Sequence, residues 1–229
     1  MIRARSRARP RAIARGALVL VRAPTARDRA EMVALRKKSR SHLARWEPRL
    51  PGGVDAFSAA YFDRLLETSR TERSQRFVVC RVEDGAIVGG VGLGDIARGP
   101  LQSCYIGYWL GADFTGHGYM TEAVCLVLGH AFTELRLHRV EANIIPSNEP
   151  SISVVRRCGF RREGYAVRYL KIDGRWQDHE RWAITAEEWR TRARAAWSAE
   201  ARDRAVGSAP IEAGTPRRRR RRSAGRASG

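Results

Sequence analysis

The sequence of 229 residues lacks any long apolar run, and no segment approaches the roughly 18 apolar residues that a membrane span requires. Its first residues are rich in arginine, as in a signal peptide. The apolar stretch that follows, Ala17–Val21, is shorter than the apolar region of about 7–15 residues that such a peptide carries. We therefore expect neither a membrane segment nor an export signal.

Cysteine is also scarce. Cys80, Cys104, Cys125 and Cys158 are widely separated, form no CxxC pair and have no histidine partner at zinc-ligand spacing. We expect free thiols in a reducing compartment, hence a cytoplasmic protein without a metal site. A covalent acetyl-enzyme route through one of these thiols is disfavoured, because none has a histidine and aspartate pattern nearby.

Acidic residues are few, with 24 Asp and Glu against 43 Lys and Arg, a formal net charge of +19. Residues 1–15 carry +6 and residues 201–229 carry +7, which leaves +6 for the rest. Such Arg-, Ala- and Gly-rich ends cannot bury enough apolar surface to fold. We expect disordered tails at 1–16 and 201–229, where Arg217–Arg222 either contacts RNA non-specifically or is a solvated segment of no specific role.

Between these tails, hydrophobic periodicity predicts an α+β domain over residues 17–186, with a terminal helix at 187–200. The sheet is expected to be mostly antiparallel, because Asp84-Gly85 and Asp173-Gly174 are strong hairpin turns. The expected strands are Leu18–Arg22, Phe77–Val82, Ile87–Leu93, Ser103–Leu110, Arg139–Ile145, Arg161–Ile172 and Arg175–Ile184. The expected helices are Asp28–His42, Asp55–Ser69, Met120–Thr133 and Ser151–Cys158.

The segment Leu110–Ala123 predicts a strand end, a glycine turn and a helix start. Backbone N–H groups at such a helix start point at one spot together with the positive end of the helix dipole, which suits a pyrophosphate. Gly116 and Gly118 allow positive φ angles and close approach of an anion. Taken alone, the turn could equally be an ordinary glycine loop that caps a core helix.

Two commoner phosphate loops are excluded. A Walker loop needs Lys-Ser or Lys-Thr after its last glycine, where this chain has Tyr119-Met120. A dinucleotide fingerprint needs a third glycine and a parallel βαβ unit near the start of the domain, and this chain meets neither requirement.

Several motifs, in their order and spacing, resemble the GNAT superfamily of N-acetyltransferases over about Val19–Ile184, and within it the ribosomal-protein-alanine (RimJ/RimL-type) branch. The motifs are Trp46–Pro48, Ile106–Leu110 running into Gly116–Ala123, His138–Asn143, Pro146–Ser151, Cys158–Phe160 and Gly174–His179. The resemblance implies an acyl-CoA N-acyltransferase domain whose sheet splays between the strand ending at Leu110 and the one beginning at Arg139. Acetyl-CoA, as co-substrate, would lie in that cleft.

The resemblance also implies the residues that hold acetyl-CoA. Backbone groups around Trp109–Gly111 would pair with the pantetheine, amides of Gly116–Met120 would hold the pyrophosphate, and Asn148 would reach the cofactor from the opposite wall. The full set is Trp109, Leu110, Gly111, Gly116, His117, Gly118, Tyr119, Met120 and Asn148.

The chain departs from the superfamily pattern in ways that affect the chemistry. Thr115 stands where Gln or Arg is common, and Met120 where Gly or Ala is common. Val155 occupies the position of a frequent tyrosine acid, whereas Ser151 matches a serine proposed as that acid in some ribosomal-protein enzymes. The carboxylate base proposed for that group falls near Leu170, so no base follows from the resemblance.

Acetyl transfer to an amine needs a base for the amine and an acid for the leaving thiolate. Our candidates are Ser151, Glu141 and the weaker Tyr165. Each has a structural alternative: Ser151 as a helix N-cap, Glu141 as a carboxylate paired with Arg139, and Tyr165 as a half-buried strand residue.

Three aromatic residues, Trp46, Phe57 and Tyr61, are candidates for a substrate groove, with core or lid packing as the alternative. His179 and Asp178 are further candidates for substrate contact, although the last strand could simply place Asp178 on one face with its neighbours.

The expected function is acetyl transfer to a primary amine, with a protein N-terminus, above all that of a ribosomal protein, as acceptor. A small amine is the rival acceptor. A non-catalytic RNA- or ribosome-binding protein on the same fold is the alternative from another class. The oligomeric state does not follow from the sequence.

Overall fold

The computed structural model describes residues 11–48 and 51–192. One eight-stranded sheet has the order β1-β2-β3-β4-β5-β6-β8-β7, and every neighbouring pair is antiparallel except β5 and β6. Its strands are β1 (Ala12–Arg15), β2 (Val19–Arg22), β3 (Gln75–Arg81), β4 (Ile87–Ala97), β5 (Ser103–Leu110), β6 (Arg139–Ile144), β7 (Arg161–Ile172) and β8 (Arg175–Thr185). The expected α+β class and mostly antiparallel sheet are confirmed.

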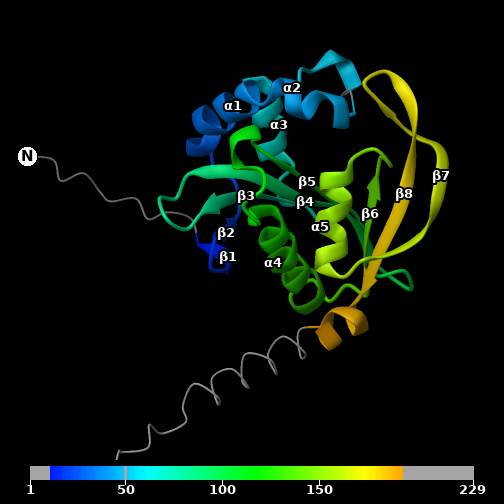
Figure 1. Cartoon of the computed structure of the whole chain (residues 1–229). Helices are drawn as coiled ribbons and strands as arrows, with labels where there is room; N and C mark the ends of the chain where they lie inside the picture. Colours follow the sequence, from blue (N-terminus) through cyan, green and yellow to red (C-terminus); the bar gives the residue numbers. More distant parts are fainter. Residues whose placement is uncertain (1–10, 49–50, 193–229) are drawn as a thin grey trace, which may run out of the picture. The chain divides into compact units, whose positions relative to one another are not determined.

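Helices cover both faces of this sheet (Figure 1). They are α1 (Arg29–Lys38), α2 (Arg40–Leu43), α3 (Ala59–Glu67), α4 (Tyr119–Thr133) and α5 (Glu149–Cys158), with short 3-10 turns η1 (Ala26–Asp28), η2 (Ala44–Trp46), η3 (Pro51–Gly53) and η4 (Ala112–Phe114). Residues 186–192 are also helical.

The alternation of side chains along β3 explains the two layers. Phe77 and Val79 point into the larger core, which α4 and α5 cover. Val78 and Cys80 point the other way, into a smaller core formed with α1 and α3. All four are buried, as expected for a central strand with helices on both faces.

The parallel pair β5 and β6 separates along its length. Only Ser103–Tyr105 pair with Arg139–Glu141, so the remaining residues of β5, from Ile106 to Leu110, have no partner on β6. On its other edge, β5 stays paired with β4 up to Leu110. The expected splay is therefore present, and it opens next to the N-terminal ends of α4 and α5 (Figure 1).

Two sequence-based boundaries need correction. Ala12–Arg15 was expected in a disordered extension but forms β1, because its backbone pairs with β2. A single helix was expected over Asp28–His42, yet the chain divides into α1 and α2 at Ser39, whose hydroxyl accepts a hydrogen bond from the Ala112 N–H at 3.0 Å. Of the expected terminal helix, residues 187–192 are helical. Residues 193–200, the tail 201–229 with Arg217–Arg222, and residues 1–10 lie outside the described part of the chain.

Candidate active site

The glycine turn before α4 adopts the conformation expected for an anion cradle. Gly116 and Gly118 have φ angles of 83° and 79°, in the left-handed region where a Cβ causes strain. Gly118 is the N-cap of α4, directly before its first residue, Tyr119. The first N–H groups of α4 cannot have partners within the helix, so this end carries a partial positive charge. No other atom lies within 4 Å of a Cβ built on Gly116, so the turn is open on that side.

A carboxylate in the first turn of α4 holds this helix start against the strand hairpin. Glu122 accepts hydrogen bonds from the backbone N–H groups of Ala17, Leu18 and Val19, at 2.7–2.8 Å. The close approach requires glycine at position 16, where a Cβ would overlap the Glu122 carboxylate. The β1–β2 connection and the glycine turn are therefore positioned together.

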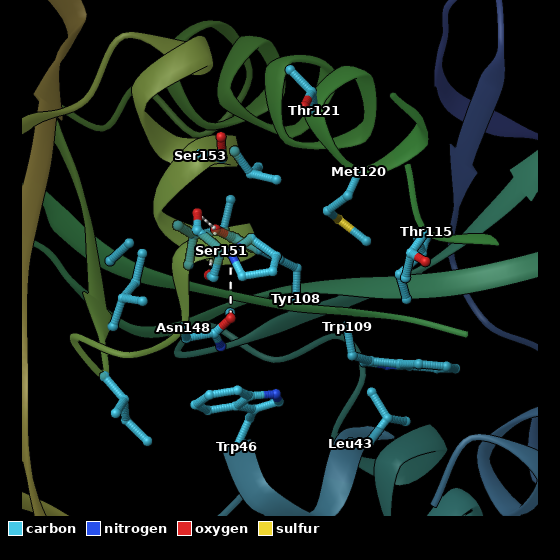
Figure 2. A pocket seen from close by; sticks show the side chains of 18 of the residues that line it. Leu43, Trp46, Tyr108, Trp109, Thr115, Met120, Thr121, Asn148, Ser151 and Ser153 are labelled. Atoms are coloured by element: carbon cyan, nitrogen blue, oxygen red, sulfur yellow. Dashed lines mark hydrogen bonds between the residues drawn. The ribbon is translucent and has the colours of Figure 1, made fainter. Parts of the chain in front are cut away.

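A cavity of about 480 Å³ lies at the splay between β5 and β6, and Figure 2 shows part of its lining. It joins the glycine turn to the N-terminal end of α5 and to the segment after α2. The residues that line it come from six regions and include Thr115, Gly116, Gly118, Tyr119, Met120, Ile106, Tyr108, Trp109, Leu110, Asn143, Asn148, Ser151, Arg157, His42, Trp46, Glu47 and His179.

Most of the residues expected to hold acetyl-CoA line this cavity, but two do not. Gly111 is engaged in the sheet, where its N–H donates to the Val88 carbonyl at 2.9 Å. His117 stacks on Tyr119, with ring centroids 5.4 Å apart and an interplanar angle of 14°. The remaining seven of the nine predicted residues are in the lining.

Ser151 lies in the cavity wall beside a residue that the sequence did not single out. Its hydroxyl oxygen is 2.9 Å from the Tyr108 hydroxyl, which also donates to the Ser151 carbonyl oxygen at 3.1 Å (Figure 2). The N-cap of α5 is Asn148, whose side-chain oxygen accepts the Ser151 N–H at 3.3 Å, so the N-cap alternative for Ser151 is wrong. Burial raises the pKa of the Tyr108 phenol, which therefore keeps its proton at neutral pH.

The other two predicted catalytic residues lie outside the cavity lining. Glu141 is paired with Arg139 and Arg181, each at 2.9 Å. This ion-pair network is the structural alternative stated for Glu141. Tyr165 is half exposed on β7 and donates to the Asp178 carboxylate at 2.9 Å. The expectation that these residues act on the substrate gains no support from the geometry, because neither residue is part of the cavity lining.

Of the three groove candidates, only Trp46 lines the cavity. Phe57 and Tyr61 instead pack on the buried guanidinium of Arg36, at 5.2 Å from each ring centroid, and Trp109 covers it at 4.7 Å. Arg36 in turn forms a 2.6 Å salt bridge to Glu47. Phe57, Tyr61 and Trp109 therefore hold Arg36 in place, and Arg36 positions the Glu47 carboxylate in the cavity lining.

His179 and Asn143 complete the wall on the β6–β8 side. His179 is buried, and its Nδ1 lies 3.0 Å from the Gln177 carbonyl oxygen. Burial lowers the pKa of this imidazole, so the ring is neutral at pH 7. A carbonyl oxygen only accepts, so Nδ1 carries the proton and Nε2 is an acceptor. Asn143 donates from Nδ2 to the Tyr169 hydroxyl at 3.2 Å.

Among residues 11–48 and 51–192, no three His, Cys, Asp or Glu side chains gather in a way that could hold a metal ion. Over the same ranges, no helix is long and apolar enough to cross a membrane. All four cysteines are free thiols, as expected.

Residues 18–161 match the acetyltransferase (GNAT) domain family. The probable N-acetyltransferase YjcK of Bacillus subtilis is 42% identical over 118 residues, which cover 52% of this chain and 65% of YjcK, just under two thirds. The [ribosomal protein uS5]-alanine N-acetyltransferase of Escherichia coli is 31% identical over 158 residues, 68% of this chain and 74% of that enzyme. The structure of Mycobacterium smegmatis RimJ in complex with CoA-disulfide has a TM-score of 0.69 at 38% identity, covering 74% of this chain and 83% of that one.

The fold, the glycine turn and the cavity at the splay define an acyl-CoA N-acyltransferase domain. The chain belongs to the GNAT family of acetyltransferases. The expected family, enzyme class and co-substrate, acetyl-CoA, are thereby confirmed.

Proposed function

We propose that this acetyltransferase acetylates the α-amino group at a protein N-terminus, with alanine at the start of a ribosomal protein as the leading acceptor. The named activity of the Escherichia coli relative supports this acceptor. The free cysteines support a cytoplasmic location.

The cavity residues fit acetyl-CoA, which supplies an activated acetyl thioester. Gly116, Gly118 and the first N–H groups of α4 would hold the pyrophosphate, with Arg157 in the lining as a cationic partner. The unpaired stretch of β5 from Ile106 to Leu110 offers backbone groups to the pantetheine, with Asn148 on the opposite wall. The Ser151 hydroxyl, hydrogen-bonded to Tyr108, would give its proton to the leaving thiolate.

The observation that carries the choice of acceptor is the charge of the cavity. Glu47 is the single acidic side chain among the described residues that line it. This one carboxylate already pairs with Arg36 at 2.6 Å, so the cavity offers little negative charge. It therefore suits a single amine, as at a protein N-terminus, better than a polyamine that carries several ammonium groups. An α-amino group also has an ordinary pKa of about 7.7–8.0, so a sizeable minority is already neutral at pH 7 and needs only a modest base.

Incubation of the enzyme with labelled acetyl-CoA and whole ribosomes, followed by mass spectrometry, tests this proposal. We expect label on one or a few N-terminal alanines, and on a synthetic peptide that begins with the same residues. The same peptide with a blocked N-terminus is the control. Label on lysine side chains, or transfer only to small amines, would contradict the proposed acceptor. Absence of any transfer with tight ribosome binding would favour the non-catalytic alternative.

A further inference from the structure

Two residues of neighbouring strands that line the cavity each carry a hydrogen-bond acceptor without a protein donor. Asn143 Oδ1 is the one buried side-chain nitrogen or oxygen within residues 11–48 and 51–192 that has no hydrogen-bond partner. A buried acceptor without a donor is unfavourable, and a bound N–H group would relieve it. His179 Nε2 is the second acceptor, because Nδ1 donates to Gln177. The β6–β8 wall is therefore suited to a group that carries several N–H bonds.

We propose that His179 accepts the proton that the acceptor amine loses during acetyl transfer, while Asn143 orients that amine through Oδ1. The inference rests on the proposed acetylation of an amine but not on which amine it is. In this step the amine nitrogen bonds to the acetyl carbon and the carbon–sulfur bond breaks. The amine proton passes to His179 Nε2, and the leaving sulfur takes a proton from the Ser151 hydroxyl. The Ser151 oxygen then regains a proton from water and His179 releases its proton to water, so both residues return to their starting states.

The other basic groups of the cavity are less suited to this task. The Glu47 carboxylate is committed to the buried guanidinium of Arg36 at 2.6 Å. Tyr108 keeps its proton because burial raises the pKa of its phenol. His42, on α2, is the remaining imidazole in the lining, and it is a matched control for His179.

Several structural features fix His179 in place. Its ring packs at 5.5 Å from the Tyr169 ring, whose hydroxyl accepts from Asn143. The charge of Asp178 acts on His179 from its own strand, and the Tyr169 ring contacts it from β7. The other titratable or charged groups among the described residues of the cavity lining are Glu47, His42, Tyr108, Tyr119 and Arg157. Burial outweighs the neighbouring Asp178 charge and lowers the imidazole pKa, so the ring is ready to take a proton at neutral pH.

The first test measures turnover of the full chain with saturating acetyl-CoA and whichever amine the wild-type enzyme acetylates. We expect His179→Gln to lower kcat by roughly 100-fold, as general-base removal typically does. His42→Gln, which changes the other imidazole of the lining, should lower kcat much less than His179→Gln does. Acetyl-CoA affinity should be unchanged in both. Imidazole added to His179→Ala should restore part of the rate, which a purely structural histidine would not allow.

The second test needs no acceptor, so it separates failure of this inference from failure of the proposed function. Nitrogen-15 NMR of the imidazole rings, assigned by comparison with His179→Gln, should show His179 as the Nδ1–H tautomer with a pKa below 6.5, the ordinary histidine value. An Nε2–H tautomer, a ring protonated at pH 7, or a larger loss of kcat in His42→Gln than in His179→Gln would each overturn the proposal.

Discussion

The hydroxyl oxygens of Tyr108 and Ser151 lie 2.9 Å apart, and their hydrogen bond links β5 to α5 where β5 has already separated from β6. Both residues belong to the cavity lining, and Figure 2 shows them between Ser153 on α5 and Trp46 on the opposite side of the view. Because Tyr108 is buried and remains a phenol, it keeps a donor next to the serine that would protonate the leaving group.

Removing either hydroxyl should slow catalysis without affecting binding. We expect Ser151→Ala and Tyr108→Phe each to lower kcat by roughly 100-fold or more, the contribution of a general acid. If the two act as one unit, the double variant will be little slower than the slower single variant. Ser153→Ala, on the same helix and in the same cavity, is the control and should retain activity. Wild-type rates in Ser151→Ala would exclude it as the acid.

The sequence predicted the regular elements well and the contacts between distant segments poorly. The bounds of β5 were predicted at Ser103–Leu110 as observed, and those of α4 within one residue, because local hydrophobic periodicity determines both. Tyr108 was missed as a partner of Ser151 because the two residues are 43 positions apart. The one sequence signal that pointed to Tyr108 was the alternation of side chains along β5, which places Tyr108 on the same face as Ile106.

The same limitation explains why the sequence offered Glu141 as a candidate base. Glu141 is a carboxylate directly before the cofactor wall, but its second partner, Arg181, comes from β8, which only the sheet order brings alongside. Local sequence likewise gives no sign that Phe57 and Tyr61 face Arg36 from another element. Such cross-strand and cross-helix pairs depend on tertiary packing.

The glycine turn offers a test of the phosphate site. Gly118→Ala should weaken acetyl-CoA binding by up to about tenfold, because the left-handed conformation costs a residue with a Cβ about 1–2 kcal/mol. Gly118→Glu should abolish binding, because it adds a carboxylate where the phosphates would lie. Calorimetry measures both, and Gly164→Ala, at an open position on β7, is the control. Unchanged affinity in Gly118→Glu would place the phosphates elsewhere.

The Arg36–Glu47 pair predicts an effect on binding of the acceptor amine but not on binding of acetyl-CoA. Glu47→Gln keeps the side-chain size and removes the charge, so we expect the KM for the amine to rise about tenfold, as for loss of one hydrogen bond to a charged group. Acetyl-CoA affinity should stay constant. The melting temperature should fall, because the buried Arg36 loses its carboxylate partner. Asp63→Asn, in an exposed pair with Arg29, is the control and should change neither the KM for the amine nor the melting temperature. An unchanged KM would mean that Glu47 does not meet the amine.

The arginine run Arg217–Arg222 predicts non-specific RNA binding that depends on salt. Deletion of residues 201–229 should flatten the plot of log affinity against log salt concentration, by about 0.7 in slope for each single-strand phosphate that the protein no longer neutralises. Filter binding or fluorescence anisotropy with a random-sequence RNA measures this slope. An identical slope in the shortened chain would show that these residues make no contact with RNA. Catalysis on a short peptide should be unaffected by the deletion.

Glu122 links the stability of the β1–β2 hairpin to acetyl-CoA binding. Its carboxylate accepts three backbone N–H groups, and Glu122→Gln would leave one oxygen and an N–H₂ group facing those donors. We expect a loss of about 1–3 kcal/mol in unfolding free energy and a lower melting temperature, by roughly 2–4 °C per kcal/mol for a chain of this size. Saturating acetyl-CoA should recover part of the loss, because it binds only the folded chain.

Glu134→Gln, at the other end of the same helix, provides the matched control for this substitution. A carboxylate there faces the negative end of the helix dipole, so its neutralisation should leave stability unchanged or raise it slightly. Equal losses of stability in the two variants would show that charge on α4, rather than the three hydrogen bonds of Glu122, determines the effect. A loss confined to Glu122→Gln would show that the hairpin is held to the helix that carries the phosphate turn.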